Sequence, residues 1–467
     1  MSQPVKLMWF RGDLRLTDNP ALHAVCAAGG PVALLYVLDE RAGAASRWWL
    51  HHSLSALAQD IESLGGHLIL RQGDPLTIIP ALATEIGAGA VHVARAFEPA
   101  HRALDRALDT ALKSRGIALH RHHSLSLFPP ERIVTKAGTP YGVFTPFSKA
   151  CLAAGVPEEV CPRPARIQGV PAPSDDLASW ALLPTHPDWA GGLRAAWQPG
   201  EAGARHNLAA FLAGPIQAYS TARDLPGHPG TSKLSPHIHF GEISPRQLWH
   251  SAASQGESKG GATYLKELLW REFSLHLLWQ HPNIRTCPIR PEFERFPWHA
   301  DTATLRAWQR GRTGVPIVDA GMRQLWQTGW MHNRVRMICA SYLVKHLLIP
   351  WQSGEAWFWD TLVDADEAAN GASWQWVAGC GADAAPYFRI FNPVLQGQKF
   401  DPEGTYIRRF VPELAKLPAA CVHAPWLAPP ALLAAAGVRL GTTYPRPLAD
   451  LAEGRARALA AFATLKV

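Results

Sequence analysis

The first 125 residues alternate between short apolar runs and helical patterns, and this alternation constrains the fold more than any other feature of the chain. Runs rich in β-branched and other apolar residues predict strands at residues 5–10, 32–39, 67–71, 90–95 and 117–122. Helical patterns fill the intervals, at residues 18–28, 46–64, 75–86 and 99–115, and Asp18 is the expected cap of the first helix. Strands that alternate with helices form parallel sheets covered on both faces. Residues 1–125 are therefore predicted to form an α/β domain around a five-stranded parallel sheet.

The remainder of the chain divides into a proline-rich segment and a helical part. Within residues 126–200, prolines recur at positions 129, 130, 140, 146, 157, 162, 164, 171, 173, 184 and 187. Because proline fixes φ and lacks an N–H donor, long helices are not expected there, and the segment is predicted to be an extended interdomain linker. Beyond it, Leu265, Leu269 and Phe273 recur at helical spacing, and strand-like alternation is scarce. Residues 201–467 are therefore predicted to be an all-α domain.

Composition narrows the classes of protein that the chain can belong to. The net charge of +7 favours a polyanionic partner, although the excess is small for 467 residues. Seven scattered cysteines without a CxxC pair are typical of reduced thiols in a cytosolic protein. No run reaches the roughly 18 apolar residues that a membrane helix needs. The turn after the first predicted strand reads RGDLRLTDNP, so the glycine-rich dinucleotide fingerprint is absent.

Two segments of the predicted helical part bring together side chains that could bind a ligand. Residues 231–235, TSKLS, bring hydroxyls and backbone amides together with Lys233, a combination that can bind a phosphate. The plain alternative is a capped turn before a helix. Further on, Glu267, Trp270 and Arg271 lie three and four residues apart and therefore share one helix face. The plain alternative there is a surface ion pair beside a partly buried indole.

Two later segments carry further candidate groups. Residues 329–337 read GWMHNRVRM, and a helix there would be either a functional face or an exposed basic turn. Residues 364–376 read DADEAANGASWQW, with Asp366 and Asn370 one turn apart and two tryptophans flanking a glutamine. Carboxylates and amides can bind a polar heterocycle, and indoles can stack on bases or carry an electron. A solvated loop with a buried tryptophan is the alternative.

Seven segments resemble motifs of the photolyase/cryptochrome flavoproteins, and they occur in that family's order over nearly the whole chain. They are residues 9–22, 144–147, 231–247, 267–273, 329–334, 364–376 and 387–401. The resemblance implies an N-terminal α/β antenna domain, a long connector and a C-terminal helical domain that binds FAD in a bent form. It implies no metal ion.

The resemblance also implies which residues hold FAD. The positions that match those at the phosphates and ribose are Tyr219, Thr231, Ser232, Lys233, Leu234 and Ser235. Asp364 and Asp366 match positions near the flavin and ribose, and Arg336 matches the salt-bridge partner of Asp364. Asn370 matches the position that faces flavin N5. An amide there can accept from N5–H without supplying a proton, which suits a fully reduced, anionic flavin.

The substrate implied by the resemblance is UV-damaged DNA. Trp270 and Trp376 match the aromatics that sandwich a flipped-out cyclobutane pyrimidine dimer, and Glu267 matches the acid that binds the pyrimidine edge. Asn333 and Met337 resemble the residues that dimer-repairing enzymes carry at these positions. The family's (6-4) enzymes have two histidines at the site, and its single-strand-preferring members usually have glutamine where Met337 stands. A damaged pair leaves the base stack at low cost. The positions that match further DNA contacts are Arg223, Arg334 and Gln396.

Two further features concern electrons and light. Trp374, Trp351 and Trp308 match the family's electron-transfer chain, which runs from flavin to surface. Residues 47–57, RWWLHHSLSAL, resemble the class III dimer photolyases, whose antenna is 5,10-methenyltetrahydrofolate. The segment 96–101 lies where folate contacts are sought, but it shows Ala100 and His101 in place of the Asn-Glu pair of class I folate enzymes. Folate is the first choice of antenna, and a deazaflavin, FMN or no antenna stay open.

The sequence therefore predicts a light-driven carbon–carbon lyase that repairs cyclobutane pyrimidine dimers by electron transfer from excited reduced FAD. A cryptochrome-type blue-light receptor without repair is the first alternative, and Asn370, Met337 and Trp270 speak against it. A light-independent flavoprotein or nucleic-acid-binding module is the second. We further expect a monomer without membrane association in the bacterial cytosol, near the nucleoid.

Overall fold

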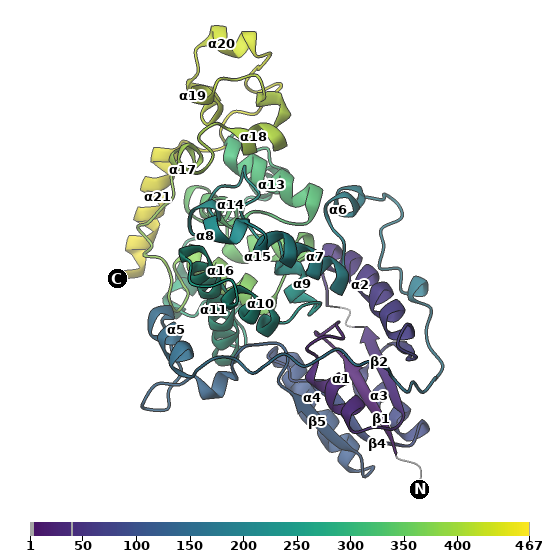
Figure 1. Ribbon diagram of the computed structural model, residues 1–467. Coiled ribbons are helices and arrows are strands. Elements are labelled where there is room, and N and C mark those ends of the chain that lie inside the picture. Colours follow the sequence, from purple (N-terminus) through teal and green to yellow (C-terminus); the bar gives the residue numbers. More distant parts are fainter. Residues whose placement is uncertain (1–3, 39–40, 467) are drawn as a thin grey trace. The chain divides into compact units, whose positions relative to one another are not determined.

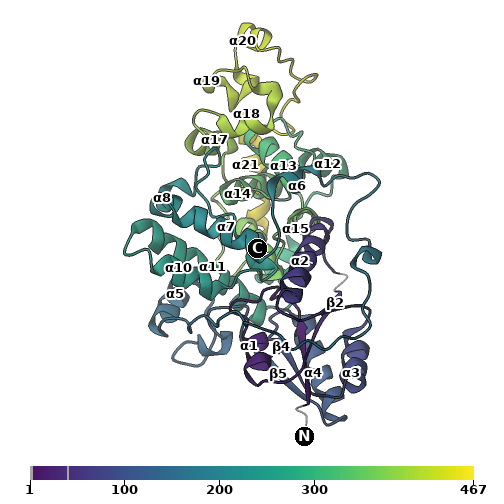
Figure 2. The same ribbon diagram turned by 45° about the vertical axis from the view of Figure 1, so that its right-hand side comes forward.

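The computed structural model describes residues 4–38 and 41–466, which form two compact units (Figures 1 and 2). The first unit comprises Met1–Gly214 and Ser232–Pro282, and the second comprises Pro215–Thr231 and Asn283–Val467. The sequence-predicted domain boundaries at residues 125 and 200 stay predictions. Residue 39, the predicted end of the second strand, lies outside the described residues.

The first unit contains the predicted five-stranded parallel sheet. Its strands are β1 (Val5–Phe10), β2 (Val32–Leu38), β3 (Leu68–Gln72), β4 (Ala88–Ala94) and β5 (Ala118–His122). They pair in the order β3-β2-β1-β4-β5, and every pair is parallel. The order reverses between β1 and β4: the connection after β1 leads to β2 on one side, and the connection after β3 leads to β4 on the other side. In parallel α/β sheets this switch point is where ligands bind.

The helices that connect consecutive strands pack against the sheet (Figure 1). They are α1 (Pro20–Ala27), α2 (Ala44–Glu62), α3 (Pro75–Glu85) and α4 (Pro99–Lys113). Helices α3 and α4 share a core with Leu7, Trp9 and Leu35, which alternate along β1 and β2 and therefore face the same side of the sheet. Helix α1 contacts β1, β4 and β5, and α2 contacts β3. The α/β fold class predicted from the sequence is confirmed.

The prediction that Asp18 caps the first helix is wrong. Asn19 is the cap, since its side-chain oxygen accepts from Leu22 N at 3.1 Å. Asp18 has a φ of +54°, and its buried carboxylate accepts from the Arg246 guanidinium at 2.9 and 3.0 Å and from the Ser244 hydroxyl. The carboxylate is thus used to tie the turn after β1 to α10 (Pro245–Ala253), a partner that local sequence does not reveal.

The proline-rich segment contains only short helices. They are η1 (Pro130–Arg132), α5 (Phe144–Ala153), η2 (Leu177–Trp180) and α6 (Gly191–Ala196). The segment is anchored to α11 (Lys259–Gln280) through Glu272, whose Oε2 accepts from Leu127 N at 2.8 Å and from Phe128 N at 3.2 Å. Helices α7 (Glu201–Leu212) and α9 (Ser235–His239) complete the described helices of the first unit.

Glu272 makes stability depend on pH. Burial raises the pKa of this carboxyl to about 7, although Arg271 and two backbone amides oppose the shift. Because the folded state then holds the proton more tightly than the unfolded state, stability falls as pH rises from about 4.5 to about 7. We expect the thermal midpoint of wild type to fall relative to that of Glu272→Gln over this window. Parallel pH profiles of the two proteins would contradict the assignment.

The named elements of the second unit, within its described residues, are all helices. Its elements are α8 (Pro215–Ala222), η3 (Pro291–Arg295), α12 (Thr302–Gln309), α13 (Pro316–Thr328), α14 (Asn333–Ser341), η4 (Tyr342–His346), α15 (Trp351–Thr361), α16 (Glu367–Ala378), α17 (Pro393–Phe400), α18 (Thr405–Phe410), η5 (Pro412–Leu414), α19 (Ala419–Val422), η6 (Pro425–Leu427), α20 (Pro430–Ala435), α21 (Leu451–Ala463) and η7 (Thr464–Lys466). Trp308, Trp351 and Trp374 lie in its hydrophobic core. Among the described residues, no helix combines the length and the hydropathy needed to span a bilayer.

Candidate functional site

An ion pair between a buried carboxylate and a half-buried arginine precedes α16. Asp364 is 9% exposed, and its Oδ2 accepts from Arg336 Nη2 at 2.7 Å. This is the pairing that the family resemblance implies. Arg336 also donates from Nε to Met331 O at 2.8 Å, so its guanidinium is held from two sides. Asp366, by contrast, is the cap of α16, where its carboxylate accepts from Ala369 N at 2.7 Å.

The other carboxylate oxygen of Asp364 indicates where a ligand could bind. Asp364 Oδ1 is buried and has no hydrogen-bond partner among the described residues. Leaving a buried acceptor unpaired costs roughly 1–3 kcal/mol, and more for a charged group. A bound molecule with an N–H or O–H donor would remove that cost. A flavin ring and a ribityl chain carry such donors, so the residues present fit FAD.

Asn370 lies one turn into α16 with its amide orientation fixed by a neighbour. Its Nδ2 donates to Glu355 Oε1 at 2.8 Å and to Glu355 O at 3.2 Å, and the side chain is buried. A carboxylate only accepts, so the NH₂ group must face Glu355 and the amide oxygen must point elsewhere. Glu355 is itself held by Arg285, with Nε at 2.6 Å, and Arg285 lies 3.5 Å from the ring centroid of Trp359.

Sequence reasoning missed Glu355 and Arg285. Glu355 sits on α15 in the run WQSGEAWFWDT, where an acid is an ordinary helical residue. The one available signal is its place among aromatic residues, which bury it to 4% exposure. The matching arginine is 70 positions away, and no local pattern links the two.

Gln375, between the two tryptophans of α16, has a structural role. It is fully buried, and its Nε2 donates to Ile284 O at 2.7 Å and to Cys287 O at 2.8 Å. Its Oε1 accepts from Ile289 N at 2.8 Å. The amide therefore fixes residues 284–289 against α16, and its hydrogen-bonding atoms are occupied by the protein itself.

The three tryptophans predicted to form an electron relay are all buried, although the outermost was expected to reach the surface. Trp374 is 2% exposed, and its ring lies 5.0 Å from that of Phe358 and 6.2 Å from that of Trp308. Trp308 was expected at the surface end of the chain, yet it is 0% exposed and its indole donates to Cys339 O at 3.1 Å. An outer member must meet solvent, so Trp308 cannot be that end. Trp351 is also fully buried and makes no ring contact within the described part of the chain.

Gly354 leaves the space that the Trp374 ring fills. A Cβ at this position of α15 would lie 2.1 Å from Trp374 Cη2, far inside van der Waals contact. We expect Gly354→Ala to displace the indole and to lower stability by roughly 1–3 kcal/mol, as overpacked cores do. Thermal unfolding with the flavin absorption spectrum checks this. Gly142→Ala is the control, because nothing lies within 4 Å of the Cβ it would add; equal melting of the two variants would contradict the close packing.

The residues matched to DNA contacts in the second unit lie on several helices. Arg334 donates to Asp224 Oδ1 at 2.8 Å, and its guanidinium lies 4.4 Å from the ring centroid of Phe400. Its Nη1 is 3.9 Å from Met337 Sδ, so those two predicted site residues lie together on α14. The other matched residues are Asn333 at the start of α14, Arg223 at 5.5 Å from the Tyr219 ring, and half-buried Gln396 on α17.

Trp376 differs from Trp374 in its surroundings. It is partly exposed, and it makes no ring contact with another aromatic side chain in the part of the chain that is described. Two residues apart on one helix, the two indoles lie about 200° apart around the axis. Trp374 is therefore part of the core, whereas Trp376 packs at its edge and stays partly exposed.

In the first unit, the predicted phosphate-binding residues precede α9. Burial raises the pKa of Tyr264 to about 12, and nearby Ser232 opposes that shift. Lys233 has a φ of +51°, and Leu234 is 1% exposed, so only its backbone can meet a ligand. Ser235 begins α9. Thr231 and Tyr219 belong to the second unit, where Tyr219 is 8% exposed on α8.

Helix α11 carries the other predicted substrate residues of the first unit. Glu267 and Trp270 are both partly exposed, one turn apart. The Trp270 indole stacks on Phe144 with ring centroids 3.6 Å apart and planes at 4°. Arg271 bonds Glu272 at 3.3 Å. The face of α11 that carries Glu267 and Trp270 is thus partly exposed to solvent, and Phe144 covers one side of the Trp270 ring.

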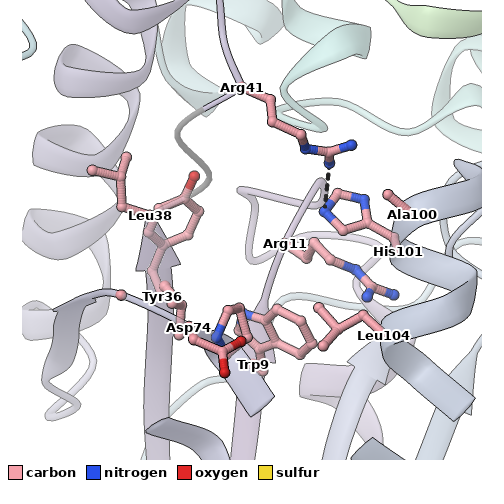
Figure 3. Close-up of a pocket in the computed structure, with 12 residues that line it drawn as sticks. Trp9, Arg11, Tyr36, Leu38, Arg41, Asp74, Ala100, His101 and Leu104 are labelled. Atoms are coloured by element: carbon pink, nitrogen blue, oxygen red, sulfur yellow. Dashed lines mark hydrogen bonds between the residues drawn. The ribbon is translucent and has the colours of Figure 1, made fainter. Parts of the chain in front are cut away.

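A cavity of about 400 Å³ opens at the carboxyl ends of β1, β2 and β3 (Figure 3). Its lining is Trp9, Arg11, Tyr36, Val37, Leu38, Arg41, Gly73, Asp74, Pro75, Ala100, His101 and Leu104. Two members come from the segment 96–101, and His101 Nε2 lies 3.0 Å from Arg41 Nη2. Arg11 is bound to Asp105 at 2.7 Å, so it is a fixed part of the wall. An aromatic wall with cations at one side can hold a flat, anionic ligand.

The segment 47–57, by contrast, contributes core side chains. Trp48 and Trp49 on α2 are 1% and 0% exposed. Trp49 donates to Glu242 Oε1 at 2.8 Å, and its ring stacks on Phe240 at 5.9 Å. These two indoles are therefore part of the packing of the first unit.

Comparisons with known proteins cover the same regions. Residues 6–165 match the family model described as DNA photolyase, and residues 264–464 match the FAD binding domain of DNA photolyase. The chain is 49% identical over 470 residues to the deoxyribodipyrimidine photo-lyase of Agrobacterium fabrum, with 98% of each chain covered. It is 36% identical to cryptochrome-1 of Arabidopsis thaliana, covering 97% of this chain and 69% of that protein.

A solved structure agrees over the full length. The crystal structure of a bacterial class III photolyase from Agrobacterium tumefaciens superposes with a TM-score of 0.97 at 48% identity, covering 100% of this chain and 98% of that one. Both family models and the full-length relatives point to the same group of flavoproteins. The chain belongs to the photolyase/cryptochrome family.

Proposed function

We propose that the protein is a light-driven lyase that binds FAD and splits cyclobutane pyrimidine dimers in DNA. The observation that carries the proposal is the group of Asp364, Arg336, Asn370 and Glu355, whose amide and carboxyl side chains are buried and in which one Asp364 oxygen has no partner among the described residues. Full-length similarity to proteins named deoxyribodipyrimidine photo-lyase and class III photolyase favours repair over the cryptochrome alternative.

The chain's own residues would hold and orient the cofactor. Asp364, held by the Arg336 guanidinium at 2.7 Å through one carboxylate oxygen, offers its second oxygen as an acceptor. Asn370 presents an amide oxygen in a fixed direction, because Glu355 holds its NH₂ group. Reduced FAD, when bound, would supply the light-excited electron that opens the cyclobutane ring and would take it back. The reaction therefore needs no net oxidant or reductant.

The substrate would be a dimer flipped out of the duplex. Trp376 and Trp270 each present a partly exposed indole, and base–aromatic stacking is worth about 1–3 kcal/mol per base. Glu267 can accept from a pyrimidine N–H. Arg223, Arg334 and Gln396 are proposed to contact the strand, and binding through phosphates would weaken with salt. Asn333 and Met337 are proposed to line the dimer's side of the site.

Because Trp308 is fully buried, an electron route from the flavin to the surface would need a different outer member. Trp298 is partly exposed, and the next residue, His299, donates from its backbone to Leu348 O at 2.7 Å, three positions before Trp351. We therefore propose Trp298 as the outer member of a route through Trp351 to Trp374. Trp326, 57% exposed and stacked on Trp357 at 5.9 Å, is the alternative exit. Indole can lose and regain an electron, so either ring can serve.

The cavity of the α/β domain is the proposed antenna site. Trp9 and Tyr36 can flank a flat ring system, and Arg41 and His101 can meet a carboxylate (Figure 3). These groups suit 5,10-methenyltetrahydrofolate, which has a pterin and a glutamate tail. A deazaflavin or FMN would use the same groups through a phosphate or ring oxygen. Extracting and identifying the pigments of the purified protein distinguishes these outcomes.

The function is tested with duplex DNA that carries one thymine dimer. The purified protein, chemically reduced, is incubated with it in light and in darkness. Loss of the dimer only in light is the expected result. Equal loss in both, or none in either, contradicts dimer repair, and repair confined to (6-4) lesions contradicts the roles given to Asn333 and Met337. A monomer in the bacterial cytosol stays a prediction, which size-exclusion chromatography and cell imaging address.

Asn370→Asp tests the amide. The new carboxyl would stand about 2.8 Å from Glu355, where two carboxylates cannot both stay ionised at low cost, so the pair would retain a proton. We expect the photoreduced flavin of this variant to shift toward a more protonated form. The readout is its absorption spectrum across neutral pH. Adding Glu355→Gln removes the second charge and should reverse much of the shift; an unchanged spectrum in the single variant contradicts the role.

A further inference from the structure

Helices α5 and α11 of the first unit pack through a ladder of aromatic rings. On α11, Trp270, Phe273 and His276 follow one another at intervals of three residues. On α5, Phe144 and Phe147 have the same spacing. Phe144 stacks on Trp270, and Phe147 lies 5.2 Å from Phe273 and 4.9 Å from His276. The two phenylalanines are 3% and 2% exposed, so both are anchored in the core.

The Phe144–Trp270 pair differs from the other ring pairs between α5 and α11 in its geometry. Phe144 and Trp270 are parallel, with centroids 3.6 Å apart and planes at 4°, whereas Phe147 meets its partners at 51° and 41°. Near-parallel rings at this distance cover one flat face of the indole almost fully. Phe273 meets Trp270 edge-on at 76° and 6.0 Å, so it fixes the ring's rotation. Among the described residues, no aromatic ring stacks on the opposite face of Trp270.

We propose that Phe144 is a positioning residue that backs Trp270 and sets the plane on which a damaged base stacks. The inference rests on the proposed function, because it takes Trp270 to be a stacking surface for the dimer. A partly exposed indole on a helix can rotate about its χ angles, and ordering it costs conformational entropy when a ligand binds. Phe144 removes that freedom beforehand, so the ring is preorganised for a ligand on its open face.

The connector residue thus takes part in lesion recognition without touching DNA. Phe144 begins α5, within the proline-rich segment, and Trp270 lies 126 positions later on α11. The segment 144–147, FTPF, therefore has two separable uses. Phe147 anchors the helix, and Phe144 supports the indole.

The test compares matched variants of the full-length, FAD-loaded protein. Phe144→Ala and Phe147→Ala each remove one buried ring from α5, and only the first removes a contact of Trp270. Affinities for duplexes with and without one thymine dimer are measured at fixed salt. Phe144→Ala is expected to lower the preference for the damaged duplex by roughly two- to tenfold, the range spanned by aromatic pair interactions. Phe147→Ala should leave the preference within about twofold, and Phe144→Tyr should restore it.

Two further measurements separate this inference from the proposed function. In a Trp270→Ala background, Phe144→Ala should cause no additional loss, because the ring it supports is gone. A crystal structure of Phe144→Ala should show the indole turned from its present plane, whatever DNA binding does. An indole that keeps its plane, or equal loss of preference in the two phenylalanine variants, overturns the positioning role. If Trp270→Ala keeps full preference while Phe144→Ala turns the indole, the positioning stands and the stacking function fails.

Discussion

Trp374→Phe is expected to slow light-driven reduction of the oxidised flavin by at least roughly tenfold, equal to about 1.4 kcal/mol in activation free energy. The indole is buried at 2% exposure beside Phe358 and Trp308, and it lies on the same helix as Asn370, one turn further along. Phenylalanine fills most of the same space but is much harder to oxidise. The variant therefore removes an electron carrier with little change of packing.

The same variant should keep its repair activity once the flavin has been reduced chemically. Dimer splitting uses an electron that returns to its source, whereas photoreduction is proposed to draw an electron from an outside donor through the tryptophans. Photoreduction is followed by the loss of oxidised-flavin absorption under continuous light, and repair is followed by dimer loss. Unchanged photoreduction would show that Trp374 is not the inner carrier, and loss of both activities would point to a disturbed flavin site.

Trp298→Phe and Trp326→Phe are the companions to this experiment. A block in Trp298→Phe alone supports the exit next to residues 348–351, and a block in Trp326→Phe alone supports the stacked pair with Trp357. Both indoles are partly exposed, so neither substitution creates a large cavity. Comparing photoreduction in these two variants distinguishes loss of an electron carrier from a general effect on folding.

The α/β domain could be predicted closely because its signals are local. Periods of two and about 3.6 residues place strands and helices, and the parallel sheet follows from their alternation. The cap of the first helix could not be assigned correctly. Asp18 and Asn19 are both good caps, and the choice depends on Arg246, which is 228 positions away.

The roles assigned to the candidate site residues stay predictions, and the burial of their side chains could not be predicted from the sequence. Family motifs named Asp364, Arg336 and Asn370, and the structure places the first two in one ion pair. Sequence carries no measure of burial for an individual tryptophan, so Trp308 was given an outer position that its 0% exposure contradicts. Glu355 was missed because its role comes from tertiary contacts on α15.

The stacking of Phe144 on Trp270 could not be predicted from the sequence either. The segment 144–147 is recognisable as a motif, but its spacing says only that two phenylalanines share a helix face. Which of them meets an indole, and in what plane, depends on the register between α5 and α11. That register is set by the whole aromatic ladder.

Trp376→Ala is expected to weaken binding of dimer-containing duplex by about tenfold or more while FAD is retained, since base–aromatic stacking is worth about 1–3 kcal/mol per base. The indole packs against the edge of the core but is partly exposed, and it makes no ring contact among the described residues. Trp374, two residues earlier, is the core member of the pair. Removing Trp376 should therefore cost recognition and little stability.

The decisive comparison for Trp376→Ala is damaged against undamaged duplex at one salt concentration. Binding to undamaged DNA depends on phosphate contacts and should change little, whereas the preference for the dimer should fall. Arg334→Gln is the reciprocal control, because loss of a cation should weaken both duplexes and lower the salt dependence by about one unit of slope. If Trp376→Ala weakens both duplexes equally, the indole supports the fold or the strand and does not stack on the lesion. Flavin absorption measured on the same samples ensures that the affinities compare proteins with equal cofactor content.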